Sequence, residues 1–434
     1  MSEVIQPVES DTLAPATAGE GALVDAILED PTALVYFLLN VGDGDTQLLL
    51  LPPDSNDGVR RLVIVDVATT KKLPDLIDEL HAVEVPATEG ARPLIQQPGS
   101  PGQIRLLVAT HPRFDHIGGM AEVLSRYNKL PSRPAAGTDG AAPAEGTSGG
   151  HMTPYLSEAC IDQFWEPGYF FPGPSFHKLM TELETSPWIR RMQPTSGTTT
   201  FLDSVKVTVL GPGVGLRTRF DTYGVEVNNS SLTLMFEYPA HRIYTEADPE
   251  DERLNRRVVR KNSRRLLLGG DAQFASWAQT TVDFPDLHSE QNPVLARELQ
   301  AARGRDYLSS DVFKMSHHAS KHGINLELME RVNAKYVLVS STGGGGRYGF
   351  PHALAMDAAR EARQATTTSG AARLTDHALG IHVTGAVLDD AAHTVLGSMA
   401  VVVSGTASRA LRIFRLMDDS RDLIDLAAAR EVGT

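Results

Sequence analysis

Two histidines and an aspartate lie close together in residues 111–119, which read HPRFDHIGG. Neutral imidazole nitrogens and carboxylate oxygens are the ligands that zinc and similar divalent metals prefer. The two glycines at the end of the segment let the backbone approach closely and let a helix begin at once. We therefore predict that this segment binds a metal ion. The alternative is a turn at a strand end that carries two incidental histidines.

The elements around this segment would place its side chains at the rim of a sheet. An apolar run at Ile104–Val108 predicts a buried strand before it, and the spacing of 120–130 predicts a helix after it. Two later predicted strands also end in metal-type side chains, one at Asp271 and one at His317 and His318. A fold that brings these strand ends to one rim would gather all of them into one cluster.

Bulk properties restrict the class of protein. The 434 residues, 41% of them hydrophobic, can bury a large core in one domain or two. A net charge of −14 argues against broad, sequence-independent binding to a nucleic acid backbone, although a local basic groove remains compatible with it. The single cysteine excludes an internal disulfide framework. No signal peptide or long apolar run is evident, so a cytoplasmic protein without membrane association is expected.

The order of patterns along the chain predicts one large domain with additions. Residues 1–30 are expected to be a flexible arm, 31–418 the domain, and 419–434 a C-terminal helix. Insertions are predicted near 131–200 and 241–265. The first begins with a low-complexity stretch, expected to be disordered, and continues with aromatic residues that favour core packing over a pocket wall. Predicted strands and helices alternate, which suggests two sheets packed face to face with helices outside.

The motifs, in this order, resemble those of the metallo-β-lactamase superfamily. More closely, they resemble the soluble hydrolase domain of ComEC-type DNA-uptake proteins. The matching segments are 40–45, 65–66, 110–119, 210–212, 228–232, 270–271, 314–320 and 348–352. The resemblance implies an α/β fold, a four-layer αββα sandwich of two mixed sheets with outer helices. Asp66, at a predicted strand end, would either hydrogen-bond to a metal ligand and so orient it, or cap a turn.

The resemblance also implies a set of metal ligands. The family motif His-x-His-x-Asp-His supplies two metal sites, which a later aspartate bridges. Carried over to this chain, the ligands are His111, Asp115, His116, Asp271 and His317. His318, beside the last of these, would support a ligand or contact the substrate.

Departures from the family pattern affect the first of the two metal sites. Arg113 replaces its second histidine, and arginine stays protonated and cannot bind a metal. Asn228 and Asn229 stand where its third histidine is expected, and Phe350 replaces another histidine near His352. We therefore expect one ion per chain, Zn²⁺ or Mn²⁺, in the second site. The guanidinium would repel a second dication and could pair with a phosphate oxygen.

The expected chemistry is hydrolysis of a phosphodiester in a nucleotide or short nucleic acid by a metal-bound water. The predicted catalytic residues are Asp115, Asp271 and His318, and the predicted substrate-binding residues are Arg113, Asn229 and His352. A rival interpretation is a degenerate subunit with a binding or regulatory role among the protein partners of a larger assembly. Hydrolysis of a lactone, thioester or β-lactam ranks lower, because those family members usually keep a complete first site.

Overall fold

A computed structural model describes most of the chain. The described residues are 21–87, 90–127, 159–169, 171–217, 227–240, 243–244, 257–258, 263–284, 306–343, 346, 348–367, 374–385, 387–389, 394–395, 397–406, 408 and 410–432. Residues 1–20, the low-complexity stretch 131–150 and most of the predicted excursion at 241–265 lie outside these ranges.

The first sheet has nine strands in the order β22-β21-β20-β1-β2-β3-β6-β7-β8. Their bounds are β1 Leu34–Leu38, β2 Thr46–Leu50, β3 Leu62–Val67, β6 Ile104–Val108, β7 Gln163–Trp165, β8 Arg190–Met192, β20 Met399–Val403, β21 Leu411–Arg415 and β22 Arg430–Val432. Pairing is antiparallel from β22 to β3 and parallel from β3 to β8, so the sheet is mixed.

The second sheet has seven strands in the order β17-β16-β15-β14-β11-β10-β9. Their bounds are β9 Thr199–Leu202, β10 Val205–Gly211, β11 Thr233–Tyr238, β14 Arg264–Leu268, β15 Val312–Lys314, β16 Tyr336–Val339 and β17 Ile381–Val383. The strands from β14 to β17 are parallel and those from β9 to β14 are antiparallel. Short two-stranded ribbons are β4 Glu84–Ala87 with β5 Gly90–Pro93, β12 Ile243–Tyr244 with β13 Arg257–Val258, and β18 Val387–Asp389 with β19 Thr394–Val395.

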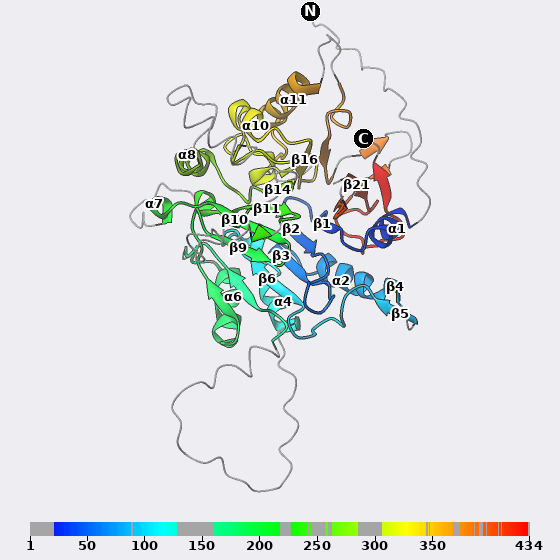
Figure 1. The fold of residues 1–434 in the computed structure, drawn as a ribbon. Helices are drawn as coiled ribbons and strands as arrows, with labels where there is room; N and C mark the ends of the chain where they lie inside the picture. The colour runs from blue at the N-terminus through cyan, green and yellow to red at the C-terminus, as the bar shows by residue number, and fades with distance from the viewer. Residues whose placement is uncertain are drawn as a thin grey trace, which may run out of the picture.

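Helices cover the outer faces of both sheets (Figure 1). The helices are α1 Ala22–Glu29, α2 Lys72–Ala82, α3 Phe114–Ile117, α4 Met120–Tyr127, α6 Pro174–Glu184, α7 Val214–Arg217, α8 Phe274–Asp283, α10 Leu326–Val332 and α11 Ala353–Thr367, with 3₁₀ turns η1 Val227–Ser230 and η2 Ser316–Ala319. Within the described part of the chain, every helix is too short or too polar to cross a membrane.

Three apolar clusters define the layers. The strands are buried on both faces, so alternate residues of β1 enter different clusters: Val35 and Phe37 face helices, whereas Tyr36 faces the other sheet. The inner cluster joins both sheets. The outer clusters join the first sheet to α1, α2, α4 and α6, and the second sheet to α8, α10 and α11. The expected four-layer αββα class of two mixed sheets with outer helices is confirmed.

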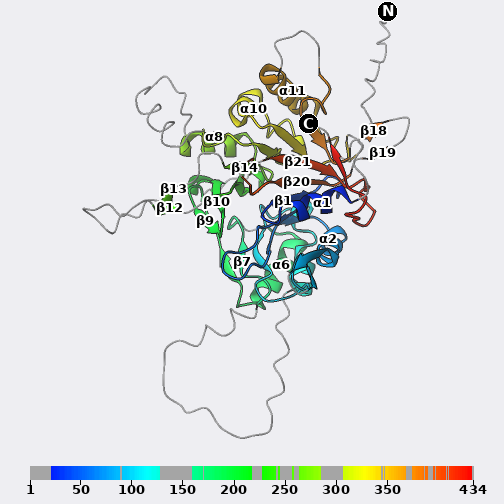
Figure 2. The same cartoon turned by 45° about the vertical axis from the view of Figure 1, so that its right-hand side comes forward.

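The two ends of the domain differ from their predictions. The flexible arm predicted for 1–30 does not extend to residue 30, because α1 buries Leu23 and Ile27 in the core. The predicted C-terminal helix at 419–434 is wrong. Ile424 and Leu426 are buried in an irregular segment against the first sheet, and β22 then pairs with β21. Figure 2 shows β20 and β21 beside β1, far along the chain from it.

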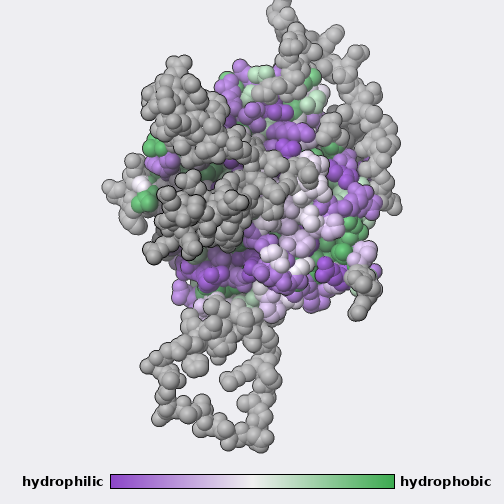
Figure 3. All heavy atoms as spheres, in the orientation of Figure 1, coloured by the Kyte–Doolittle hydropathy of each residue, from purple (hydrophilic) through white to green (hydrophobic). Residues whose placement is uncertain are grey.

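The aromatic segment predicted as part of an insertion also belongs to the sheet. Its residues form β7 and β8 as well as α6, and Trp165 is buried between the sheets. β7 and β8 have only three residues each, so their alternating pattern is too short to recognise in the sequence. The described surface in Figure 3 is largely hydrophilic, in keeping with the net charge of −14.

Candidate metal centre

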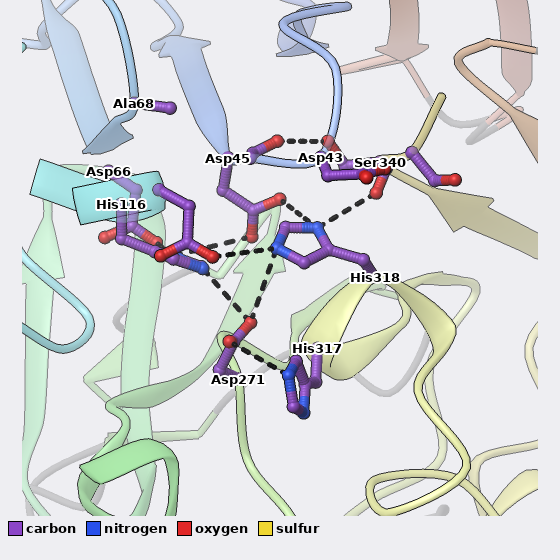
Figure 4. Close-up of polar contacts among 12 residues, drawn as sticks. Asp43, Asp45, Asp66, Ala68, His116, Asp271, His317, His318 and Ser340 are labelled. Atoms are coloured by element: carbon purple, nitrogen blue, oxygen red, sulfur yellow. Dashed lines mark hydrogen bonds and ion pairs between the residues drawn. The ribbon is translucent and has the colours of Figure 1, made fainter. Parts of the chain in front are cut away.

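Three strand ends from the two sheets meet at one place. The segment after β6 carries His111. Asp115 and His116 follow it within the short helix α3. In the second sheet, two glycines after β14 lead to Asp271, and η2 after β15 carries His318. Figure 4 shows the side chains of His116, Asp271 and His318 converging on one place. The clustering expected from the strand ends is therefore present.

Four residues bring their ligand atoms within 4.8 Å of one another: Asp115, His116, Asp271 and His318. The Nε2 atom of His116 lies 3.1 Å from Oδ1 of Asp271, and Nε2 of His318 lies 3.9 Å from the same oxygen. The Nε2 atom of His111 approaches the other oxygen, Oδ2, at 3.5 Å. One oxygen of Asp271 thus faces His116 and His318, and the other faces His111.

The donor atoms of this cluster fit a metal ion. Nε2 of His111, His116 and His318 and both carboxylate oxygens of Asp271 are buried and have no well-oriented hydrogen bond to any described residue. Burying a polar group without a partner costs about 1–3 kcal/mol, so five such atoms facing one point need a common partner. Imidazole nitrogens and carboxylate oxygens match the preferences of Zn²⁺ and Mn²⁺.

The far side of each imidazole is fixed by a second contact. Nδ1 of His116 lies 2.7 Å from Oδ2 of Asp66, which also accepts from the hydroxyl of Thr110, and Oδ1 of Asp66 accepts from the N–H of Thr110. Nδ1 of His318 lies 2.9 Å from the carbonyl oxygen of Ser340, to which it donates. With Nδ1 as the donor, Nε2 of each ring keeps its lone pair toward the cluster, as in most protein metal sites. Asp66 therefore orients a candidate ligand and does not merely cap a turn.

Electrostatics keep the carboxylates of the cluster ionised. Burial raises the pKa of Asp271, but His116 and His111 outweigh it and hold that pKa well below its usual value. Burial also raises the pKa of Asp115, but the nearby His318, whose Nε2 lies 3.8 Å from the carboxylate, and the charge of His116 outweigh burial, so the net shift is downward. Burial and the neighbouring His116 lower the pKa of His111 far below its ordinary value, which keeps that ring neutral. Ionised carboxylates and a neutral imidazole are the forms that bind a metal.

His116 has the opposite shift from His111. Burial lowers its pKa, but the carboxylates of Asp271 and Asp66 on its two sides outweigh burial and raise the pKa well above its ordinary value. A metal ion at Nε2 would therefore compete with a proton held between these carboxylates. Metal affinity at this site is accordingly tied to proton release.

The late histidine of the cluster is His318, whereas the resemblance assigned His317. The ring of His317 contacts two amides instead: Nδ2 of Asn228 lies 3.2 Å from its Nε2, and Nε2 of Gln273 lies 3.2 Å from its Nδ1. Its Nε2 is 3.8 Å from Asp271. Both histidines have left-handed backbone angles, with φ of 50° and 52°. This tight turn decides which ring enters the cluster.

Two residues predicted to contact the substrate have hydrogen-bond partners within the protein, and their role toward a substrate stays a prediction. Oδ1 of Asn229 accepts from the N–H of Ser276 in the first turn of α8, so this amide ties η1 to that helix. The ring of His352 accepts from the N–H of Leu354 at the start of α11. Sequence alone could not separate these local backbone contacts from substrate binding.

Arg113 lies at the rim of the cluster, directly before α3. It is partly exposed, and its charge lowers the pKa of both His111 and His317, so the guanidinium is near both rings. Within the described ranges, no carboxylate lies within ion-pair distance of it. A cation therefore lies near the side of the cluster that carries His111 and His317.

Asp45 is a part of the site to which the sequence motifs assigned no role. It is fully buried, its N–H donates to the carbonyl of Asp115 at 3.0 Å, and its carboxylate pairs with Lys314. Oδ1 of Asp45 also lies 3.6 Å from Nδ1 of His318. The only indication of its role in the sequence is that Asp45 lies within the matching segment 40–45.

A methyl group at Gly118 should damage the turn that carries Asp115 and His116. A Cβ there would lie 2.6 Å from the carbonyl oxygen of Ala68 and 2.7 Å from that of Phe114, and backbone atoms cannot rotate away. We expect Gly118→Ala to lower the free energy of unfolding by about 1–3 kcal/mol and to reduce metal retention. Urea unfolding and elemental analysis measure both. Gly215→Ala, which meets nothing within 4 Å, is the matched control and should change neither.

Comparison with known proteins gives similarity of structure only. No family model matches the sequence, and no curated protein matches it. The metallo-β-lactamase-fold protein YhfI from Bacillus subtilis is 8% identical, with 81% of this chain and 95% of that chain covered and a TM-score of 0.34. A long-form RNase Z from yeast is 11% identical, with 72% and 38% covered and a TM-score of 0.32. A diphosphatase of the PhnP family is 10% identical, with 81% and 93% covered and a TM-score of 0.30.

These similarities concern metallo-β-lactamase-fold proteins, the group that the sequence motifs resemble. The closer relation to ComEC-type domains remains a prediction. The layer order and the side-chain geometry described above come from this chain's own residues, and the chemistry that follows depends on those alone.

Proposed function

We propose that this chain is a metal-dependent phosphodiesterase that holds one divalent ion between Asp115, His116, Asp271 and His318. The observation that carries the proposal is the convergence of five buried polar atoms that lack hydrogen-bond partners among the described residues. Such an arrangement is costly unless a cation satisfies it. A bound Zn²⁺ or Mn²⁺ would act as a Lewis acid and make water a nucleophile near neutral pH.

The chain's own residues would bind and orient the reactants. The side chain of Asp115 is 30% exposed and ionised, so its carboxylate can accept a proton from an attacking water. Arg113 offers a planar fork of donors to a phosphate oxygen from the side of His111 and His317. Because that side carries a guanidinium and two amides, we expect only one tightly held ion.

Aromatic rings extend from the cluster toward solvent and support a substrate with a flat ring. Phe350 lies 5.7 Å from the ring of His318, and Tyr348 stacks on Phe350 at 5.8 Å with an interplanar angle of 29°. Tyr348 is 63% exposed. Nucleobases stack on aromatic side chains with little sequence preference, so a nucleotide beside the scissile phosphate would suit this surface.

The test combines metal analysis with a substrate panel. We expect about one equivalent of transition metal per chain, and metal-dependent cleavage of dinucleotides or short single strands in preference to an alkyl phosphodiester that lacks a base. Arg113→Met should lower kcat/KM by about 10²-fold, whereas Arg126→Met, at an exposed surface ion pair, should not. Two equivalents of metal would contradict the single-ion site. Absence of hydrolysis with both Zn²⁺ and Mn²⁺ would favour the rival interpretation, a binding or regulatory subunit.

A further inference from the structure

A second group of buried polar side chains lies outside the metal centre, at the edge of the second sheet. Arg415 ends β21, Tyr336 begins β16, His382 is the middle residue of β17, and His377 precedes that strand. β17 is the edge strand of its sheet. These four residues form what we call the edge cluster.

The strand residues of the edge cluster face the space between the two sheets. Tyr336 belongs to the inner apolar cluster, and so does Ile413, two residues before Arg415 on the same strand. Ile381 and Val383 point to the outer helices, so His382 between them points inward. The rings confirm the grouping: Tyr336 lies 6.2 Å and His377 5.5 Å from His382, centroid to centroid.

The guanidinium of Arg415 is buried and only partly satisfied. The residue is 1% exposed, and Nη2 donates to the carbonyl oxygen of Val383 at 2.6 Å. Nε and Nη1 have no acceptor among the described residues. The carboxylate of Asp418 is close enough to interact with this guanidinium electrostatically, but that carboxylate already pairs with Lys72 and accepts from Ser398. A buried cation without its own anion is among the costliest arrangements in a protein interior.

The neighbours of Arg415 also lack acceptors. The hydroxyl of Tyr336 and Nδ1 of His377 are buried atoms without a hydrogen-bond partner in the described part of the chain. Burial lowers the pKa of Arg415 to about 9, and burial together with the charge of Arg415 lowers that of His382 to about 3. Of these groups, Arg415 alone carries a positive charge, and burial opposes that charge. An acceptor with several oxygen atoms would satisfy all of these groups at once.

We propose that the edge cluster is an anion-binding site for a phosphate group, contacted by the guanidinium of Arg415, the hydroxyl of Tyr336 and Nδ1 of His377. The fork of Nη1 with the second N–H of Nη2 can bind two oxygens of a tetrahedral oxyanion, and the two neutral groups would offer donors to the others. His377 is partly exposed and marks the side from which the ligand enters. The site takes either free phosphate or the terminal phosphate of a small metabolite. It does not depend on the proposed phosphodiesterase activity.

The test uses metal-free full-length protein labelled with ¹³C-histidine, because phosphate could also bind a metal ion or Arg113. Imidazole signals are assigned with His377→Gln and His382→Gln. We expect inorganic phosphate in the millimolar range, but not chloride at equal ionic strength, to shift the signals of His377 and His382. Glycerol phosphate distinguishes the two sources: tighter binding than that of inorganic phosphate indicates a metabolite, and weaker binding indicates the free ion.

Variants separate this site from the metal centre. Arg415→Lys keeps the charge but removes the fork, so the affinity for phosphate should fall at least about tenfold. Arg113→Met should leave the affinity unchanged. Shifts that persist in Arg415→Lys and vanish in Arg113→Met would overturn the proposal, as would the absence of any shift. Should Arg415→Lys not fold, His377→Gln serves instead, and it should remove the increase in Tm that phosphate causes, about 2–4 °C at saturation.

Discussion

Replacing Asp271 by asparagine is expected to remove the metal ion and the activity together. The carboxylate is fully buried, and its two oxygens face Nε2 of His116 at 3.1 Å and Nε2 of His111 at 3.5 Å. Asparagine keeps the shape but loses the negative charge and one acceptor oxygen. We expect transition-metal content to fall to a small fraction of an equivalent, and kcat to fall by about 10³-fold or more. Elemental analysis and single-substrate kinetics measure these changes.

Two neighbouring histidines provide the sharpest control for this result. His318→Gln should lose metal as Asp271→Asn does, because Nε2 of His318 belongs to the four-ligand cluster. His317→Gln should retain most of its metal, because that ring contacts the amides of Asn228 and Gln273. Metal loss in the His317 variant with retention in the His318 variant would restore the assignment made from the resemblance. Retention in all three variants would remove Asp271 from the site altogether.

The fold was predictable where burial imposes a pattern over a whole strand. Runs such as Leu34–Leu38 and Leu62–Val67 are buried at every position, and apolar runs of this kind indicate strands inside a layered fold. The C-terminal residues mislead for a physical reason. Apolar residues such as Ile424 and Leu426 satisfy the core equally well from an irregular segment as from a helix, so their spacing does not fix the backbone.

The metal centre was predictable in composition but not in detail. Residue types at three strand ends identified the cluster, because strand ends share a rim. The choice between His317 and His318 depends on the left-handed backbone angles of both residues, a conformation that only a few per cent of non-glycine residues adopt. The contact between Asp45 and Lys314 joins residues 269 positions apart, and nothing local in the sequence specifies that pair.

Removing the charge of Lys314 should cause the largest loss of stability of any single change proposed here. Lys314 and Asp45 are both 0% exposed and form an ion pair beneath the metal centre. Lys314→Met fills similar volume but leaves the carboxylate of Asp45 buried without its cation. Breaking a buried pair in this way costs about 3–5 kcal/mol, which urea unfolding measures. The exposed pair of Arg126 with Asp78 offers the comparison, since its disruption should cost at most about 1 kcal/mol.

A double variant shows whether the loss comes from an orphaned charge. In Lys314→Met with Asp45→Asn, neither member of this pair is left as an unpaired buried ion, so we expect much of the stability lost in Lys314→Met to return. The metal centre should still suffer, because Oδ1 of Asp45 lies 3.6 Å from Nδ1 of His318 and its N–H holds the carbonyl of Asp115. Equal instability in the single and double variants would mean that Lys314 acts through packing. Recovered stability with weakened metal retention would mean that this pair holds the metal ligands in position without contacting the metal itself.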